Sequence, residues 1–205
     1  HARQIFQTLN SAAITTLIVE TDSPKTALQL LSSVESLDHR VANTVAWSVI
    51  KNRRFQEFAQ RLIQPPTSLY EIARLIVKVR DISFRAAIKL TDRLLPVLQQ
   101  AIMNDKRLTA LGFMLGVLRR TNGRVAGDIL LSIKDAVKLD DLLDREAEPV
   151  RFAKTLLSIY GVDKKLVGNY LESVDDFHWI RLFGRCRNLT QVALLLRAVT
   201  LTTYT

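Results

Sequence analysis

The chain has 205 residues, 48% of them hydrophobic, with 29 Lys and Arg against 20 Asp and Glu and a formal net charge of +9. That length and composition allow a sizeable core and exclude a disordered, collagen-like or disulfide-built chain. Glycine and proline number only seven and five, too few for the many tight turns of an all-β protein. The composition therefore favours an all-α fold.

Self-similarity along the chain indicates a repeat. Six segments align without gaps on a small residue that lies within an apolar stripe of helical period. These anchor residues are Ala13, Ala42, Ala73, Gly112, Ala153 and Ala193. The stripe of one segment, for example, consists of Leu111, Leu115 and Leu118. A small anchor lets a neighbouring helix approach closely, so we expect larger residues there to disrupt the packing between segments.

A second helix is expected to begin ten residues after each of the first five anchors. The residues there are all good helix N-caps: Ser23, Asn52, Ser83, Asn122 and Asp163. Pro24 directly follows Ser23, at the position where a missing N–H is harmless. Apolar residues recur seventeen and twenty-one residues after each anchor, on one face of this second helix. They are Leu30, Ala59, Leu90, Ile129 and Tyr170 at the first position, and Val34, Ile63, Leu94, Ile133 and Val174 at the second.

The pattern predicts an all-α fold, an α-solenoid of about six helix–turn–helix repeats in a single domain over residues 1–205. The architecture would be of the HEAT or tetratricopeptide class. Anchor spacings of 29 and 31 residues leave room for two helices per unit, whereas the later spacings of 39, 41 and 40 leave room for a third. We expect the additional short helices at Asp135–Asp144 or at Asp175–Phe183.

Two of the segments, IARLIVKVRDISFRAAIKLTDRL at residues 72–94 and FAKTLLSIYGVDKKLVGNYLESV at residues 152–174, are similar to the degenerate helical repeats at the C-terminal end of prokaryotic NLR-like (STAND) signalling NTPases. That resemblance implies a repeat module within a larger signalling protein. The first two segments, at residues 14–34 and 43–63, also resemble pentatricopeptide repeats, which would imply RNA binding. The later segments depart from that family's near-constant repeat length.

A basic residue stands two residues after each predicted N-cap. The five are Lys25, Arg54, Arg85, Arg124 and Lys165, which we call the basic column. In the first turn of a helix the macrodipole disfavours a cation by about 0.3–1 kcal/mol, so local stability does not explain the column. Stacked repeats would align it into a ridge, with Arg53 and Arg120 beside it. The ridge would lie where the chain is most basic, since residues 51–124 hold fifteen Lys and Arg against five Asp and Glu.

Two interpretations fit the basic column. It can be a solvated edge, or a ladder in which each cation pairs with an acidic residue of a neighbouring unit. It can instead be a docking ridge for an acidic protein surface or for the phosphates of a nucleic acid. A nucleic acid would also need aromatic side chains for base stacking, and Trp47, Phe55, Tyr70 and Phe84 fit a role in the core at least as well.

Signatures of catalysis and metal binding are missing from the sequence. It contains no glycine-rich phosphate loop, and His1, His39 and His178 are too isolated for a metal site. We expect no enzyme activity, no metal and no cofactor. His178 stands beside Asp175 and Asp176, where a histidine is expected to cap a helix or to lie at the surface.

The single cysteine, Cys186, cannot form an internal disulfide, which makes a reducing compartment, the cytoplasm, our default location. The flanking Arg185 and Arg187 would lower the pKa of an exposed thiol, whereas the alternative is a small buried hydrophobic residue. Apolar runs fall short of the ~20 residues of a membrane span, so we expect no membrane partner. Because the chain starts at His1 rather than at a methionine, we expect a piece of a longer protein.

Together these features predict a non-enzymatic scaffold or sensor module. Its partner would be another protein, or another domain of the same chain, bound along the stacked helices. The alternative is an RNA- or DNA-binding module that uses the basic column, with Arg53 and Arg120, on a nucleic acid or another polyanion.

Overall fold

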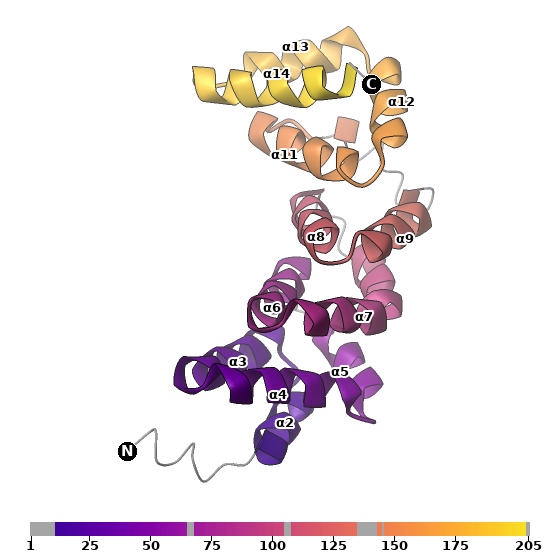
Figure 1. Cartoon of the computed structure of the whole chain (residues 1–205). Helices are drawn as coiled ribbons and strands as arrows, with labels where there is room; N and C mark the ends of the chain where they lie inside the picture. Colours follow the sequence, from indigo (N-terminus) through magenta and orange to yellow (C-terminus); the bar gives the residue numbers. More distant parts are fainter. Residues whose placement is uncertain (1–10, 65–67, 105–107, 135–142, 145, 204–205) are drawn as a thin grey trace. The chain divides into compact units, whose positions relative to one another are not determined.

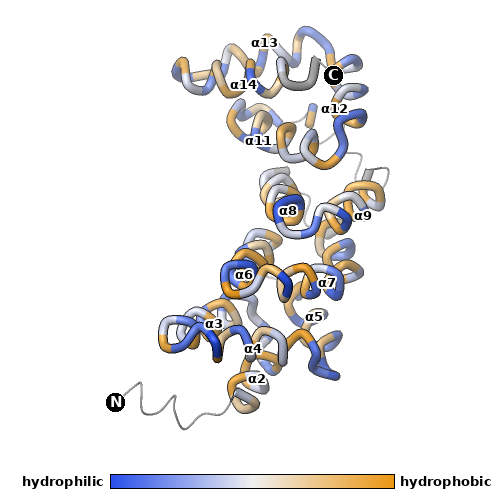
Figure 2. The backbone as a smooth tube through the Cα atoms, viewed as in Figure 1, coloured by the Kyte–Doolittle hydropathy of each residue, from blue (hydrophilic) through white to orange (hydrophobic). Residues whose placement is uncertain are grey.

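In a computed structural model of the chain, the described residues are 11–64, 68–104, 108–134, 143–144 and 146–203 (Figure 1). They form α-helices and, within these ranges, no strand, which confirms the all-α prediction. The helices are α2 (Ser11–Glu20), α3 (Pro24–Leu37), α4 (His39–Lys51), α5 (Phe55–Leu62), α6 (Leu69–Ile82), α7 (Phe84–Asn104), α8 (Leu108–Thr121), α9 (Gly123–Lys134), α11 (Pro149–Tyr160), α12 (Lys164–Ser173), α13 (Asp176–Gly184) and α14 (Leu189–Thr203). Hydrophobic and hydrophilic residues are interleaved along them (Figure 2), so one face of each helix is suited to burial.

The chain divides into two compact units, His1–Ala101 and Ile102–Thr205, with the division near the end of α7. A single domain over residues 1–205 stays a prediction. The six predicted anchors lie in α2, α4 and α6 of the first unit and in α8, α11 and α14 of the second, which we call the anchor helices.

In the first unit the anchor helices pack in chain order, because α4 lies against both α2 and α6. Ala42 of α4 and Ala73 of α6 are completely buried, as expected for small residues between closely packed helices. The helix α5 lies against α2 and α4. In contrast, α3 lies against α4 and α6 as well as α2, so it contacts an anchor helix that is not adjacent to it in the chain.

The buried face of α3 differs from the prediction. The apolar seam was expected at Leu30 and Val34, but the structure buries Ala27, Leu31 and Val34 and leaves Leu30 only half-buried. The packing of α3 on both α4 and α6 accompanies the change: Leu31 lies about 100° further round the helix than Leu30 and is buried in its place, while Val34 is buried as predicted. The other seam residues are buried as predicted at Ala59, Leu90, Leu94, Ile129, Ile133 and Tyr170, and half-buried at Ile63 and Val174.

In the second unit α11 packs against both α8 and α14, while α9 packs on α8 and α12 packs on α11 and α14. The approach of α8 to α11 is close at Gly112. A Cβ atom added there would lie 2.5 Å from the hydroxyl oxygen of Thr155 and 3.0 Å from the Thr155 Cα atom. A larger residue at this anchor therefore cannot fit without moving α11, in agreement with the steric role predicted for the anchors.

The last anchor departs from this pattern. Ala193 of α14 is exposed, so the expected close helix contact at this residue is wrong. Leu195 and Ala198, on the opposite side of α14, are completely buried instead.

The side chains of all five predicted N-caps accept a hydrogen bond from a backbone N–H two or three residues later in the chain. The donors are the backbone N–H groups of Thr26, Arg54, Ala86, Val125 and Leu166, bonded to Ser23, Asn52, Ser83, Asn122 and Asp163 respectively. The predicted helix starts are thereby confirmed for α3, α7, α9 and α12. The helix α5 begins later than predicted, at Phe55, because Asn52 Oδ1 first closes a turn with the N–H of Arg54 at 2.8 Å.

One of the two additional short helices is also confirmed. The predicted segment Asp175–Phe183 corresponds to α13, whose N-cap Asp175 accepts the backbone N–H of His178 at 2.7 Å. The other, Asp135–Asp144, lies outside the described residues except for its last two positions.

Candidate functional site

The basic column occupies the starts of α3, α5, α7, α9 and α12. All five of its side chains are exposed, and so are those of Arg53 and Arg120. Each side chain follows a capped turn, which fixes its backbone. The residues chosen from the sequence are thus all at the surface, where a partner can reach them.

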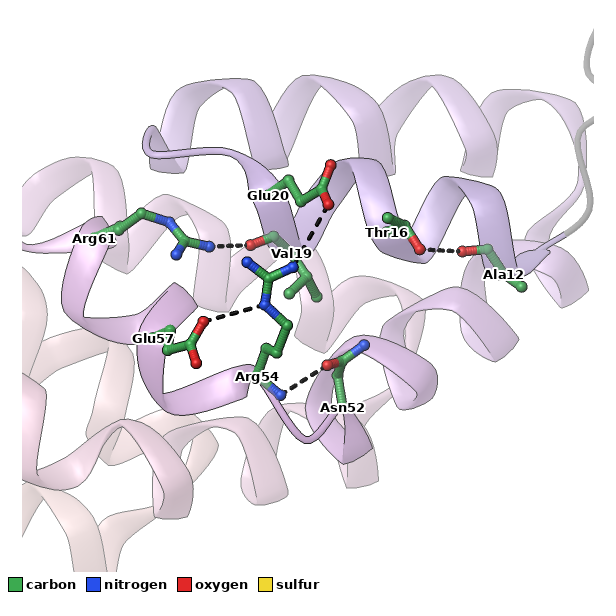
Figure 3. Close-up of polar contacts among 8 residues, drawn as sticks. All are labelled: Ala12, Thr16, Val19, Glu20, Asn52, Arg54, Glu57 and Arg61. Atoms are coloured by element: carbon green, nitrogen blue, oxygen red, sulfur yellow. Dashed lines mark hydrogen bonds and ion pairs between the residues drawn. The ribbon is translucent and has the colours of Figure 1, made fainter.

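Arg54 has two acidic neighbours (Figure 3). Its Nε donates to the Glu57 carboxylate at 3.1 Å, and its Nη1 lies 3.6 Å from the Glu20 carboxylate at the end of α2. The contact with Glu20 joins two neighbouring helical pairs, as the ladder interpretation requires. Because all three side chains are about half exposed, each such pair contributes about 0–1 kcal/mol to stability.

The other column members have different surroundings. Arg124 forms an ion pair of 3.2 Å with Asp128 one turn further along its own helix. Lys25, Arg85 and Lys165 have no acidic side chain within 4.0 Å in the part of the chain that the structure describes. An ion pair between neighbouring helical pairs is therefore found at Arg54. It is not a general property of the basic column.

In the second unit, Arg119 brings two of the predicted turns together. Its side chain lies against Gly161, so closely that a Cβ atom there would overlap the Arg119 guanidinium. The end of α8 thus meets the turn between α11 and α12. Lys164 and Lys165 follow that turn, and Lys164 Nζ lies 5.5 Å from the centre of the Tyr160 ring. The structure therefore places cations of two consecutive helical pairs at neighbouring turns in this unit.

Two arginines of the first unit have a role that the sequence did not reveal. Arg61 of α5 donates to the backbone carbonyl of Val19 near the end of α2 (Figure 3), and Arg93 of α7 donates to that of Ile50 near the end of α4. Both carbonyls belong to the second-last residue of an anchor helix. A guanidinium at a helix C-terminus satisfies an otherwise unpaired carbonyl and interacts favourably with the macrodipole.

This role lowers the number of cations available to a partner. Arg61, Arg93 and Lys78, which pairs with Glu35 of α3, all hold helices of the first unit together. Arg61 lies nineteen residues after the anchor Ala42, and Arg93 lies twenty residues after the anchor Ala73. The later repeats have no arginine at either of these positions. Because these arginines do not recur in every repeat, the repeat pattern gives no sign of them.

Aromatic side chains lie both inside and outside the core. Phe55 is completely buried and Trp47 is half-buried, with Lys51 Nζ 5.5 Å from its ring centre. Phe84 and Tyr70 are 53% and 48% exposed, so a core role is wrong for both. Phe84 directly precedes Arg85, which places one exposed ring beside a member of the basic column.

His178 is a core residue, contrary to the expected surface or capping role. It is 95% buried, with its ring 5.3 Å from the Phe152 ring and 6.1 Å from the Trp179 ring. Burial and the charge of Arg181 lower the pKa of His178, with opposing contributions from Asp144 and Asp175. Its Nδ1 lies 2.7 Å from Nη2 of Arg181, and because a guanidinium only donates, this contact favours a neutral imidazole whose Nδ1 accepts.

Cys186 is partly buried, and its thiol donates to the Leu182 carbonyl oxygen at 3.6 Å. Burial, followed by the charge of Glu148, raises the pKa of the Cys186 thiol. This direction is opposite to the one that Arg185 and Arg187 would cause, so it gives no support to a thiolate activated by these arginines.

Other classes of site find no support in the described part of the chain. Its residues hold no group of three or more His, Cys, Asp or Glu arranged for a metal ion, and none of its helices is both long and apolar enough to cross a bilayer. No family model matches the chain, and no curated protein or solved structure matches it either.

Proposed function

We propose that this protein is an α-solenoid of helical-hairpin repeats that works as a non-enzymatic scaffold or sensor and binds an acidic protein surface. The observation that carries the proposal is the capped turn followed by an exposed cation, present at all five predicted positions. The packing of anchor helices in chain order within each unit supports the repeat organisation. The likeness to the repeats of NLR-like signalling NTPases supports a sensor role, and the single cysteine, Cys186, is compatible with a reducing, cytoplasmic compartment.

The surroundings of the column favour carboxylates as its ligands. Arg54 already holds two carboxylates of its own chain, and Arg124 holds one. A guanidinium group that already binds a carboxylate of its own chain is held in place. It can therefore bind a carboxylate of a partner at little additional ordering cost. An acidic partner would displace Glu20 or Asp128 and would bind Lys25, Arg85 and Lys165 directly.

A nucleic acid is the second candidate, favoured by the exposed ring of Phe84 next to Arg85. Base stacking on an aromatic ring beside a phosphate-binding cation is a common mode of single-strand binding. The described chain offers this combination at one member of the column. An acidic protein surface, which needs no stacking rings, therefore fits better.

Charge reversal distinguishes the column from general basicity. We expect Arg54→Glu, Arg85→Glu and Arg124→Glu together to weaken binding of a labelled polyglutamate peptide by about tenfold or more in fluorescence anisotropy. The matched control reverses three exposed cations outside the column, Arg74→Glu, Lys89→Glu and Lys154→Glu, and should cost far less. Equal losses in the two triple variants would remove the column from the proposal.

The same assay separates the two candidates. A labelled single-stranded RNA should bind more weakly than the peptide at physiological salt. Tighter binding of the RNA, with a steep loss of affinity on adding salt and a further loss in Phe84→Ala, would establish the nucleic-acid candidate instead.

A further inference from the structure

The anchor helix α14 has an exposed apolar face. Leu189 and Leu196 are 85% and 47% exposed, and Ala193 between them is exposed as well. Their spacing of four and three residues places them on one side of the helix. Thr200 lies on the same side of the helix and Arg197, its only charged residue, at the edge, so polar groups border the face while its centre is apolar.

The same positions are buried in four of the other five anchor helices, whereas in α2 Ala13 is half-buried and Thr16 is exposed. Position for position, Ala193 and Leu196 correspond to an anchor and to the residue three further along. In α4, α6, α8 and α11 these residues are Ala42 and Val45, Ala73 and Ile76, Gly112 and Leu115, and Ala153 and Leu156, all of them buried. α14 therefore carries the residues of an internal helix layer, exposed to solvent.

Packing inside the second unit shows which neighbour such a face receives. The anchor face of α8 contacts α11 through Thr155, which lies two residues after the anchor of α11. α11 in turn packs on α14, whose residue two after its anchor, Leu195, is completely buried. Each anchor helix thus turns one face to the preceding anchor helix and the opposite face to the following one.

We propose that the face formed by Leu189, Ala193 and Leu196 docks the first helix of one more helical hairpin of the α11–α12 type. The face continues the α8–α11–α14 interface, and the expected occupant presents a short side chain two residues after its anchor, as Thr155 does toward Gly112. An end cap of a repeat array has a polar outer face, whereas the outer face of α14 exposes two leucines and an alanine beside Arg197 and Thr200. The inference depends on helix packing in the second unit and not on the basic column.

The test uses the full chain with a second copy of residues 149–173 joined after Thr205 by a flexible linker. That copy carries Thr155→Ala, because Ala193, unlike Gly112, has a Cβ atom that would meet the threonine hydroxyl. We expect amide hydrogen exchange in α14 to slow by about tenfold or more relative to the original chain. Far-UV circular dichroism should show that the added hairpin is helical.

Two substitutions in the extended chain complete the test. Leu196→Glu should remove the protection of α14, whereas Leu131→Glu, at a leucine of α9 that is 69% exposed, should leave it unchanged. Unchanged exchange in α14, an unfolded hairpin, or equal protection in both variants would overturn the proposal. So would dimers of the original chain that Leu196→Glu dissociates in sedimentation, because the occupant would then be a second copy. The copied hairpin adds a second Lys165 of the basic column, so polyglutamate should bind the extended proteins at least as tightly as the original chain whether or not the hairpin docks on α14, and failure of one proposal is distinguishable from failure of the other.

Discussion

The guanidinium carbon of Arg93 lies 4.3 Å from the centre of the Phe55 ring, and the same group donates to the Ile50 carbonyl oxygen at the end of α4. One side chain of α7 thus fixes both the end of α4 and the start of α5. Arg61 makes the equivalent bond to Val19 one helical pair earlier. The first unit therefore uses arginine as a structural residue as well as a surface residue.

Replacing Arg93 should destabilise the protein strongly for a partly exposed residue. Arg93→Met removes a charge-assisted hydrogen bond and the cation–π contact, with an expected loss of about 1–3 kcal/mol in the free energy of unfolding. Arg85→Met, in the same helix but with an exposed side chain, should change it by less than about 0.5 kcal/mol. Urea denaturation of the two variants measures the difference, and similar losses would show that the Arg93 contacts contribute little.

Three glycines provide a graded test of helix approach in the second unit. Gly112→Ala should cost about 1–3 kcal/mol, because its Cβ would lie 2.5 Å from the Thr155 hydroxyl oxygen. Gly127→Ala, in α9 with nothing within 4 Å of the new atom, should instead stabilise by about 0.5–1 kcal/mol through helix propensity. Gly116→Ala, 3.4 Å from the Ser158 hydroxyl oxygen, should fall between them. Thermal unfolding gives the order, and a stabilising Gly112→Ala would contradict the tight contact.

The cap of α12 should contribute measurably to stability. Asp163 accepts the Leu166 N–H at 3.0 Å, and Asp163→Ala leaves this donor without its partner. We expect a loss of about 1 kcal/mol in urea denaturation, against almost no change for Glu172→Ala at an exposed position of the same helix. Equal effects of the two substitutions would mean that this hydrogen bond does not stabilise the helix start.

Stability should fall with acidity between neutral and mildly acidic pH because of His178. Its pKa is lowered in the folded protein below the ordinary value of 6.5, so the unfolded chain binds the proton more readily. The free energy of unfolding should therefore decrease as the pH falls from about 6.5 toward the folded-state pKa, and then level off. His178→Gln should flatten this dependence in urea titrations. An unchanged slope in His178→Gln would contradict the assignment.

Local patterns in the sequence were enough to predict the helix starts and most of the core. The caps at Ser23, Ser83, Asn122 and Asp163 depend on a side chain and a backbone N–H three residues away, so sequence spacing determines them. The exposure of the basic column follows in the same way from its place in the first turn. By contrast, the burial of Leu31 in place of Leu30 goes with the packing of α3 on both α4 and α6, which no local pattern reveals.

The sequence predicted which residues form the candidate site but not which residues surround them. The contacts of Arg54 with Glu20 and of Arg61 with Val19 join residues 34 and 42 positions apart in the chain, which meet only in the fold. His178 was misjudged because its neighbours in sequence are acidic, while its neighbours in space are the Phe152 and Trp179 rings. Aromatic exposure at Phe84 and Tyr70 was equally inaccessible, since periodicity alone does not show which face of a helix remains uncovered.

The spacing of the arginine bonds has a consequence for synthesis of the chain. Arg61 follows Val19 by 42 residues and Arg93 follows Ile50 by 43. At a translation rate of about 5–20 residues per second, each of these helix ends waits about 2–9 s for its guanidinium to be made. During that interval the C-terminal carbonyl groups of α2 and α4 have no guanidinium partner. The nascent protein therefore acquires its stability in steps, each completed when the next arginine emerges.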